Sequence, residues 1–134
     1  MIPILWVFND FALLVVRIVF GIIFIAHGLP KLRNIEATSQ GFQAMGFAPG
    51  AFWARFIALL EVLGGGAMIV GVMVQPLAWL FAIEMLVTAL KVNRKKGLVG
   101  GYEFDLILLA VAVLLGTLGA GKISLDQYLP VFLF

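Results

Sequence analysis

The stretch RIVFGIIFIAHGLPKL at residues 17–32 decides the fold of this chain. It belongs to an apolar run that extends from about Phe11 to Leu29 and ends at Pro30-Lys31. The run is long enough to cross the hydrocarbon core of a bilayer as a helix, which takes roughly 17–25 residues. Because lipid offers the backbone no hydrogen-bond partners, such a segment must satisfy its polar groups internally, and we expect an α-helix.

Three similar apolar stretches follow, and each ends at a turn or charge signal. They lie at about 52–74, 77–92 and 102–118, and Gln75-Pro76 forms a tight link between the first two. We therefore predict an all-α integral membrane protein, a four-helix bundle formed by one domain over residues 1–134 with spans at about 11–29, 52–74, 77–92 and 102–118. In the loop after the first span, residues Glu36 to Met45 are predicted to form a short amphipathic helix at the membrane interface.

The composition agrees with a membrane protein. Of the 134 residues, 63% are hydrophobic and 12% are charged, and the mean hydropathy is +1.15, whereas soluble domains carry about 25% charged residues. A chain this small cannot hide so many apolar side chains from water. The net charge of +2 gives no footprint for nucleic acid, and the absence of cysteine excludes disulfides and thiolate metal sites.

The basic residues predict the orientation. One side of the membrane receives seven of them, in or beside the first and third loops: Lys31, Arg33, Arg55, Lys91, Arg94, Lys95 and Lys96. The other side, with both termini, receives only Lys122, while Arg17 lies inside the first span. By the positive-inside rule the first and third loops are cytoplasmic and both termini are outside.

Ionisable residues inside the spans mark the candidate site, because each costs about 2.5–3.5 kcal/mol at a helix centre unless it finds a partner or water. The candidates for ligand binding or proton relay are Arg17, His27, Lys31, Glu61, Glu84, Glu103 and Asp105. At 1.5 Å per residue, Glu61 and Glu84 both lie roughly 12–14 Å from the cytoplasmic end of their spans. Arg17 is deeper, at roughly 20 Å, and is expected to extend toward Glu61 or Glu84. These depths predict a polar cavity in the cytoplasmic half of the bundle.

Structural roles compete with this interpretation. An ion pair such as Arg17 with Glu61 can simply set the register of two helices, and Lys31 at a span end can be an anchor that extends to the interface. Glu103 and Asp105 can complement the dipole at the start of the fourth span. Several acid and base groups at similar depth nevertheless favour a polar site over separate structural pairs. No spacing of residues indicates a metal site or a nucleotide-binding loop.

Four stretches in order resemble the DoxX family of membrane proteins. They are RIVFGIIFIAHGLPKL at 17–32, ALLEVLGG at 58–65, GGYEFDL at 100–106 and GAGKISLD at 119–126. The resemblance implies a four-helix protein of the bacterial or archaeal cytoplasmic membrane, related to the membrane subunit of thiosulfate:quinone oxidoreductase. The resemblance implies that the family's site residues correspond to Arg17, His27, Lys31, Glu61 and Glu103 of this chain. Glu84 lies outside the family pattern, and Lys91-Val92-Asn93 stands where many relatives have a histidine.

Three functions remain open at this point. The first is a membrane subunit associated with redox chemistry, whose polar site binds a quinone or a small oxidisable molecule. It would be a subunit of a quinone-linked oxidoreductase, with quinone as the candidate cofactor, nothing bound covalently, and a redox partner protein as the electron donor. The second is a transport protein for protons or small solutes, and the third is a scaffold without catalysis that holds a cytoplasmic partner. Besides lipid, a second copy of the chain is a candidate partner.

The orientation gives a direct test. A periplasmic reporter enzyme fused after Phe134 should be active, and a reporter that works only in the cytoplasm should be silent at that position. The reverse pattern, with activity only from the cytoplasmic reporter, would contradict the predicted orientation.

Overall fold

The computed structural model describes residue 5 and residues 8–129, and these are organised around four long helical spans. The spans, each long and apolar enough to cross a membrane, are Asn9–Arg33, Gly50–Val70, Val74–Lys96 and Leu98–Leu118. The predicted all-α fold with four apolar helices is therefore confirmed. The chain is a multi-pass membrane protein, and its outward-facing apolar side chains contact lipid.

Most spans consist of more than one helical element. The first is α1 (Asn9–Arg33), and the loop after it contains α2 (Ile35–Ala44). The second comprises α3 (Gly50–Leu59), the π-helical turn η2 (Leu60–Gly64) and α4 (Gly65–Val70). The third comprises α5 (Val74–Val87), the π-helical turn η3 (Thr88–Asn93) and the 3₁₀ turn η4 (Arg94–Lys96). The fourth comprises η5 (Leu98–Tyr102) and α6 (Glu103–Leu118), and a short turn η6 (Asp126–Tyr128) follows.

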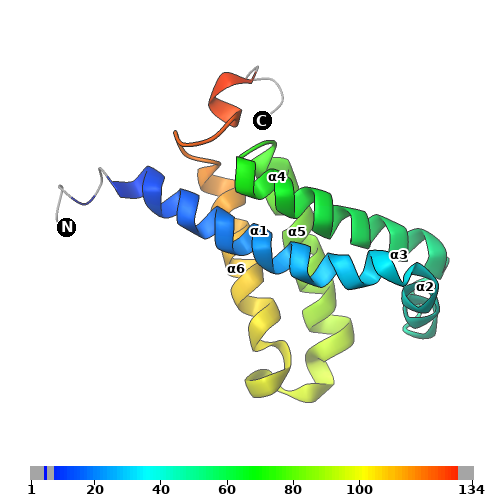
Figure 1. Cartoon of the computed structure of the whole chain (residues 1–134). Helices are drawn as coiled ribbons and strands as arrows, with labels where there is room; N and C mark the ends of the chain where they lie inside the picture. The colour runs from blue at the N-terminus through cyan, green and yellow to red at the C-terminus, as the bar shows by residue number, and fades with distance from the viewer. Residues whose placement is uncertain (1–4, 6–7, 130–134) are drawn as a thin grey trace.

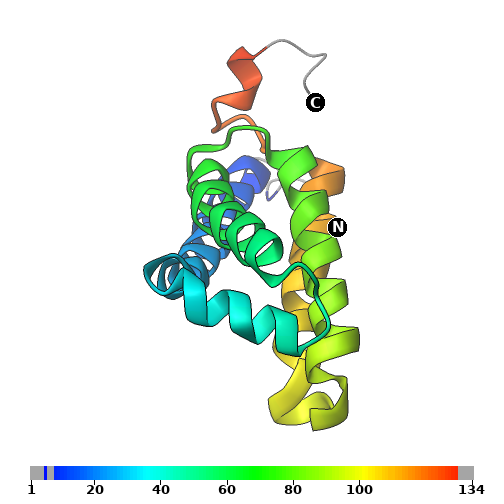
Figure 2. The same cartoon turned by 90° about the vertical axis from the view of Figure 1, so that its right-hand side faces the viewer.

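The helices pack as two antiparallel pairs that cross. α1 lies along the second span, and α5 lies along α6 (Figure 1). Figure 2 shows the two pairs as separate layers, with α2 below the start of the second span. The pairs diverge toward the end that carries α2 and the α5–α6 connection. That divergence provides the space for the site described below.

Two glycines allow α1 and α4 to touch. A Cβ atom added to Gly65 would lie 2.7 Å from the carbonyl oxygen of Gly21, and a Cβ atom on Gly21 would collide with the carbonyl oxygen of Gly65. Small residues at such a crossing let two backbones approach closely, which is how helices gain contact in lipid.

An aromatic cluster holds the two helix pairs together. Phe20 and Phe24 of α1 pack on Phe81 of α5, with ring centroids 5.4 and 4.0 Å from the Phe81 ring. Met68 of α4 and Leu115 of α6 are fully buried in the same core. These large side chains fill the centre of the molecule, between its two polar regions.

The turn between the second and third spans differs from the prediction. Gln75 and Pro76 do not form the link; they lie in the first turn of α5. Proline is tolerated there because the first N–H groups of a helix have no partner within it. The chain reverses instead at Gly71 and Met73, whose φ angles are 82° and 51°. The carboxylate of Asp126 accepts hydrogen bonds from the backbone N–H groups of Met73 and Val74, at 2.6 and 3.0 Å, and so begins α5.

Arg17 does not extend toward Glu61 or Glu84, which corrects the expectation from its depth. Its fully buried guanidinium donates to the backbone carbonyl oxygens of Met68 (3.1 Å), Ile69 (3.5 Å), Ile123 (2.9 Å) and Ala120. Carbonyls at a helix C-terminus have no partner within the helix, and α4 ends at Val70, immediately beyond Met68. Arg17 therefore joins α1, the end of α4 and the segment after α6.

The helix after the first span forms as predicted, displaced by one residue. α2 covers Ile35–Ala44 rather than Glu36–Met45. The side-chain oxygen of Asn34 accepts the N–H of Ala37 at 3.3 Å and caps its start. At its other end, the amide oxygen of Gln43 accepts the N–H of Gly50 at 2.8 Å, so that α2 is bound to the start of α3.

The Arg17 cluster predicts a large effect on stability. Arg17→Leu leaves four carbonyl oxygens without their charged donor, and we expect the free energy of unfolding to fall by about 3 kcal/mol or more. Arg33→Leu removes an exposed arginine from the same helix and should change stability little. Unfolding of both variants in detergent measures the difference, and equal stabilities would contradict this role for Arg17.

Candidate functional site

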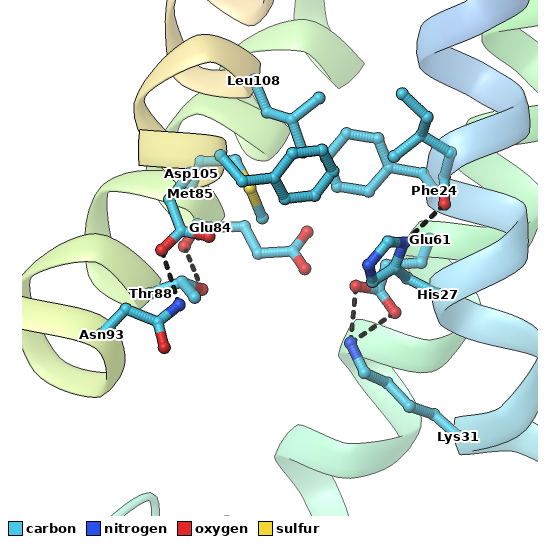
Figure 3. Close-up of a pocket in the computed structure, with 12 residues that line it drawn as sticks. Phe24, His27, Lys31, Glu61, Glu84, Met85, Thr88, Asn93, Asp105 and Leu108 are labelled. Carbon is cyan, nitrogen blue, oxygen red and sulfur yellow. Dashed lines mark hydrogen bonds and ion pairs between the residues drawn. The ribbon is translucent and has the colours of Figure 1, made fainter. Parts of the chain in front are cut away.

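A polar cavity of about 230 Å³ lies where the two helix pairs diverge. α1 and η2 form one wall, and α5, η3 and α6 form the other (Figure 3). Its polar lining residues are His27, Lys31, Glu61, Glu84, Thr88, Asn93 and Asp105. The structure thus brings together five of the seven candidates from the sequence.

The first wall carries a buried ion pair. Lys31 Nζ lies 2.6 Å from both carboxylate oxygens of Glu61. The Glu61 side chain is 3% exposed and that of Lys31 is 30% exposed. The pair forms because Gly28 lets the helices approach: a Cβ atom on Gly28 would lie 2.7 Å from the Cβ atom of Glu61. Lys31 is therefore an ion-pair partner inside the protein, and not only an interfacial anchor.

The second wall carries a chain of hydrogen bonds. The amide nitrogen of Asn93 donates to the carboxylate of Asp105 at 2.7 Å, and the ammonium of Lys96 donates to the amide oxygen of Asn93 at 2.9 Å. Asp105 is buried, whereas Lys96 is exposed. The chain therefore runs from a buried acid in the cavity to a charged group at the surface.

Glu84, from α5 of the second wall, faces the first wall. Its side chain points across the cavity toward Glu61 (Figure 3). Its Oε2 atom is buried and has no hydrogen-bond partner among the described residues. The neighbouring hydroxyl of Thr88 donates to the backbone oxygen of Glu84 at 2.9 Å and so does not serve the carboxyl group. Since an unpaired polar atom in a buried position is costly, the carboxyl group of Glu84 has an oxygen open to a hydrogen bond with a ligand.

His27 completes the polar lining. Its Nδ1 atom lies 2.8 Å from the carbonyl oxygen of Ile23. Because a carbonyl oxygen can only accept, we assign the hydrogen to Nδ1, which leaves Nε2 available to a ligand. The imidazole also stacks on Phe104, with ring centroids 5.8 Å apart.

Apolar residues close the rest of the cavity. Phe24, Met85 and Leu108 are buried and line it on the side of the aromatic cluster. The cavity is consequently polar on two walls and apolar at its base.

Two candidate residues lie outside the cavity. Arg17 belongs to the separate cluster of carbonyl groups, on the other side of the aromatic core. Glu103 is exposed, and its carboxylate accepts the N–H of Gly100 at 2.8 Å. This contact stabilises the start of α6, which is the structural role that the sequence analysis offered for Glu103.

The sequence candidates missed Thr88 and Asn93. Thr88 follows Glu84 by four residues and shares its helix face, which was a usable signal. Asn93 lies one residue beyond the predicted end of the third span. Nothing in its local sequence indicated that η3 would extend the helix and bring it into the cavity.

The sequence comparisons agree with the resemblance. The family model of DoxX matches residues 12–94. The chain belongs to the DoxX family. A DoxX relative from Bacillus subtilis (strain 168), named "Putative oxidoreductase CatD", is 33% identical over 115 residues, which cover 86% of this chain and 84% of the relative. No solved structure matches this DoxX protein.

In this DoxX protein, the described residues (residue 5 and residues 8–129) provide no metal site at the cavity. Those residues contain no group of three or more His, Asp or Glu side chains that could hold a metal ion. Two acids of the cavity, Glu61 and Asp105, accept hydrogen bonds from Lys31 and Asn93 instead.

The ion pair of the first wall gives a prediction on stability. Lys31→Met leaves the Glu61 carboxylate buried without a cation, and we expect a loss of about 3 kcal/mol. The double variant Lys31→Met/Glu61→Gln should recover most of that loss, because the unpaired charge is removed as well. Lys95→Met, at an exposed lysine, is the control. If Lys31→Met and Lys95→Met unfold alike in detergent, the pair does not contribute.

Proposed function

We propose that this DoxX protein is a membrane subunit associated with redox chemistry, and that its cavity binds the polar ring of a quinone or a similar small oxidisable molecule. The observation that carries the proposal is the buried, unpartnered Oε2 of Glu84, which faces the Lys31–Glu61 pair across a cavity of about 230 Å³. Such a site is built to receive hydrogen bonds from a guest molecule and to donate them.

The lining fits both redox forms of a quinone. The oxidised ring has two carbonyl oxygens that accept hydrogen bonds, and Lys31 and Asn93 are donors in the lining. Reduction adds two electrons and two protons, which turns both oxygens into hydroxyl donors. The free oxygen of Glu84 is then a suitable acceptor. Either form of the ring therefore finds partners.

Proton exchange with the ring is proposed to use Asp105 of the second wall. Asp105, Asn93 and Lys96 form a continuous hydrogen-bonded chain from the cavity to an exposed loop. A carboxyl group beside the ring can exchange a proton with it. The amide of Asn93 holds the Asp105 carboxylate in place and does not itself carry protons.

The electrons are proposed to come from a redox partner protein. The chain has no cysteine and one histidine, so it lacks the thiolates that hold iron–sulfur clusters. The name of the Bacillus subtilis relative, which includes the word oxidoreductase, supports a role in such chemistry. We assign the binding and protonation of the ring to this chain and the electron supply to its partner.

Binding is favoured over transport by the packing of the core. The aromatic cluster of Phe20, Phe24 and Phe81 lies between the cavity and the Arg17 cluster. The cavity is therefore a pocket with a closed base in the described part of the chain. Together with the predicted orientation, this supports a site in the cytoplasmic half of a bacterial or archaeal cytoplasmic membrane.

Substitution of Glu84 tests the proposed binding. Glu84→Leu should lower the affinity for a benzoquinone without a tail by at least about tenfold, or roughly 1.4 kcal/mol. The same change should leave the protein as stable as before, because it removes an unpaired buried polar group. The measurement is the amount of quinone retained by the purified protein in lipid nanodiscs, above that in empty nanodiscs.

The control is Glu36→Leu, which makes the same change at an exposed position of α2 outside the cavity and should leave retention unchanged. Failure of the unsubstituted protein to retain quinone, or equal retention by the Glu84→Leu variant, would contradict the proposed function.

A further inference from the structure

An apolar groove of about 440 Å³ lies beside the polar cavity. α2 and the second span form one side of it, and α5 with η3 forms the other. Its largest lining residues are aromatic and aliphatic, among them Phe42, Trp53, Phe56, Leu60, Ile83 and Val87. Ile83 is 60% exposed and Phe56 is 41% exposed. Since both residues lie in membrane spans, the groove opens toward the acyl chains of the bilayer.

The groove and the polar cavity are adjacent. Lys31, Glu84 and Thr88 line both of them. These three residues are also nearly all of the polar residues in the groove; the other one is Lys91, which lies over the ring of Phe47 at 5.6 Å. A molecule with its polar part in the cavity can therefore extend directly into the groove.

The sizes of the two spaces support one shared occupant. Ligand sites commonly have volumes of roughly 300–1,000 Å³. The cavity alone, at about 230 Å³, is smaller than that, whereas the cavity and groove together lie within the range. The cavity accommodates a ring, and the groove accommodates what is attached to the ring.

We propose that the groove holds the hydrocarbon tail of a quinone whose ring occupies the polar cavity, and that such a ligand enters sideways from the bilayer. This inference rests on the proposed function and specifies its ligand class as a quinone with a lipid tail, in contrast to a small water-soluble oxidant. The polar ring then lies in the cavity, and the apolar tail lies in the groove.

The charge at the shared boundary favours an uncharged ring over a phosphate. The ammonium of Lys31 is already neutralised by both oxygens of Glu61. Glu84 adds an acceptor beside it. A phospholipid headgroup in the cavity would therefore meet no cation free of a carboxylate, while a quinone ring needs none; Lys91 lies over Phe47 in the groove.

The effect of the groove on binding is steric. A tail that moves from lipid into an apolar groove leaves one apolar environment for another and gains little free energy. The groove matters because the ring cannot enter the cavity unless its tail has an unobstructed path outward. A blocked groove should therefore exclude quinones with a tail and still admit the same ring without one.

The experiment compares two benzoquinones with the same ring, one with a decyl tail and one without, on the full chain in nanodiscs. Ile83→Trp/Val87→Trp adds two large rings inside the groove. Leu86→Trp/Leu90→Trp adds the same bulk to exposed positions of the same span that do not line it. The first variant should lose at least about tenfold in affinity for the decyl quinone and keep its affinity for the ring alone. The second should bind both quinones normally.

The outcomes separate the groove from the cavity. If the groove variant binds both quinones normally or loses both equally, while Glu84→Leu still abolishes retention, the tail site is wrong and the proposed function stands. If the unsubstituted protein retains neither quinone, both fail. Release of a co-purifying phospholipid by the groove variant, with unchanged decyl quinone binding, would assign the groove to lipid and overturn the inference. Ile83→Phe/Val87→Phe serves as the smaller replacement if the tryptophan variant does not fold.

Discussion

The rest of this structure depends on one constraint: a polar group inside a bilayer has to find its partner within the protein. The chain meets it in two separate regions. Arg17 satisfies the carbonyl oxygens at the end of α4 and after α6, and Lys31 neutralises Glu61 near the other end of α1. The aromatic cluster between them keeps the two regions apart. One helix thus contributes a basic residue to each of two clusters with different purposes.

The two clusters differ in how many of their polar atoms have a hydrogen-bond partner. Arg17 is fully buried and hydrogen-bonded to four carbonyl groups, which are the marks of a structural group. The cavity contains a buried carboxylate oxygen without a partner, a half-exposed hydrogen-bond chain and an opening to an apolar groove. Because incomplete satisfaction costs stability, a protein retains it where a ligand completes the set. This contrast is why we propose the cavity, and not Arg17, as the functional region.

Local helix distortions aim the side chains of the cavity. The π-helical turn η2 contains Glu61, and η3 contains Thr88 and Asn93. Turns of this kind often occur at functional sites because the extra residue shifts the helix face that follows. The regular spacing of about 100° per residue placed Glu61 and Glu84 at one depth, which was useful. It could not show that Asn93 turns inward to meet Asp105, because that depends on the irregular turn.

By itself, the sequence determined the four spans, the all-helical fold, the family and five of the residues that line the cavity. These depend on hydropathy, length and depth along a helix, which are local properties. Only the tertiary structure decided which groups pair. Lys31 meets Glu61 because α1 packs along the second span, where Gly21, Gly28 and Gly65 let the two backbones approach. Arg17 meets carbonyl groups because the end of α4 and the segment after α6 converge on it. The cavity and its groove exist where those pairs diverge, which no single span encodes.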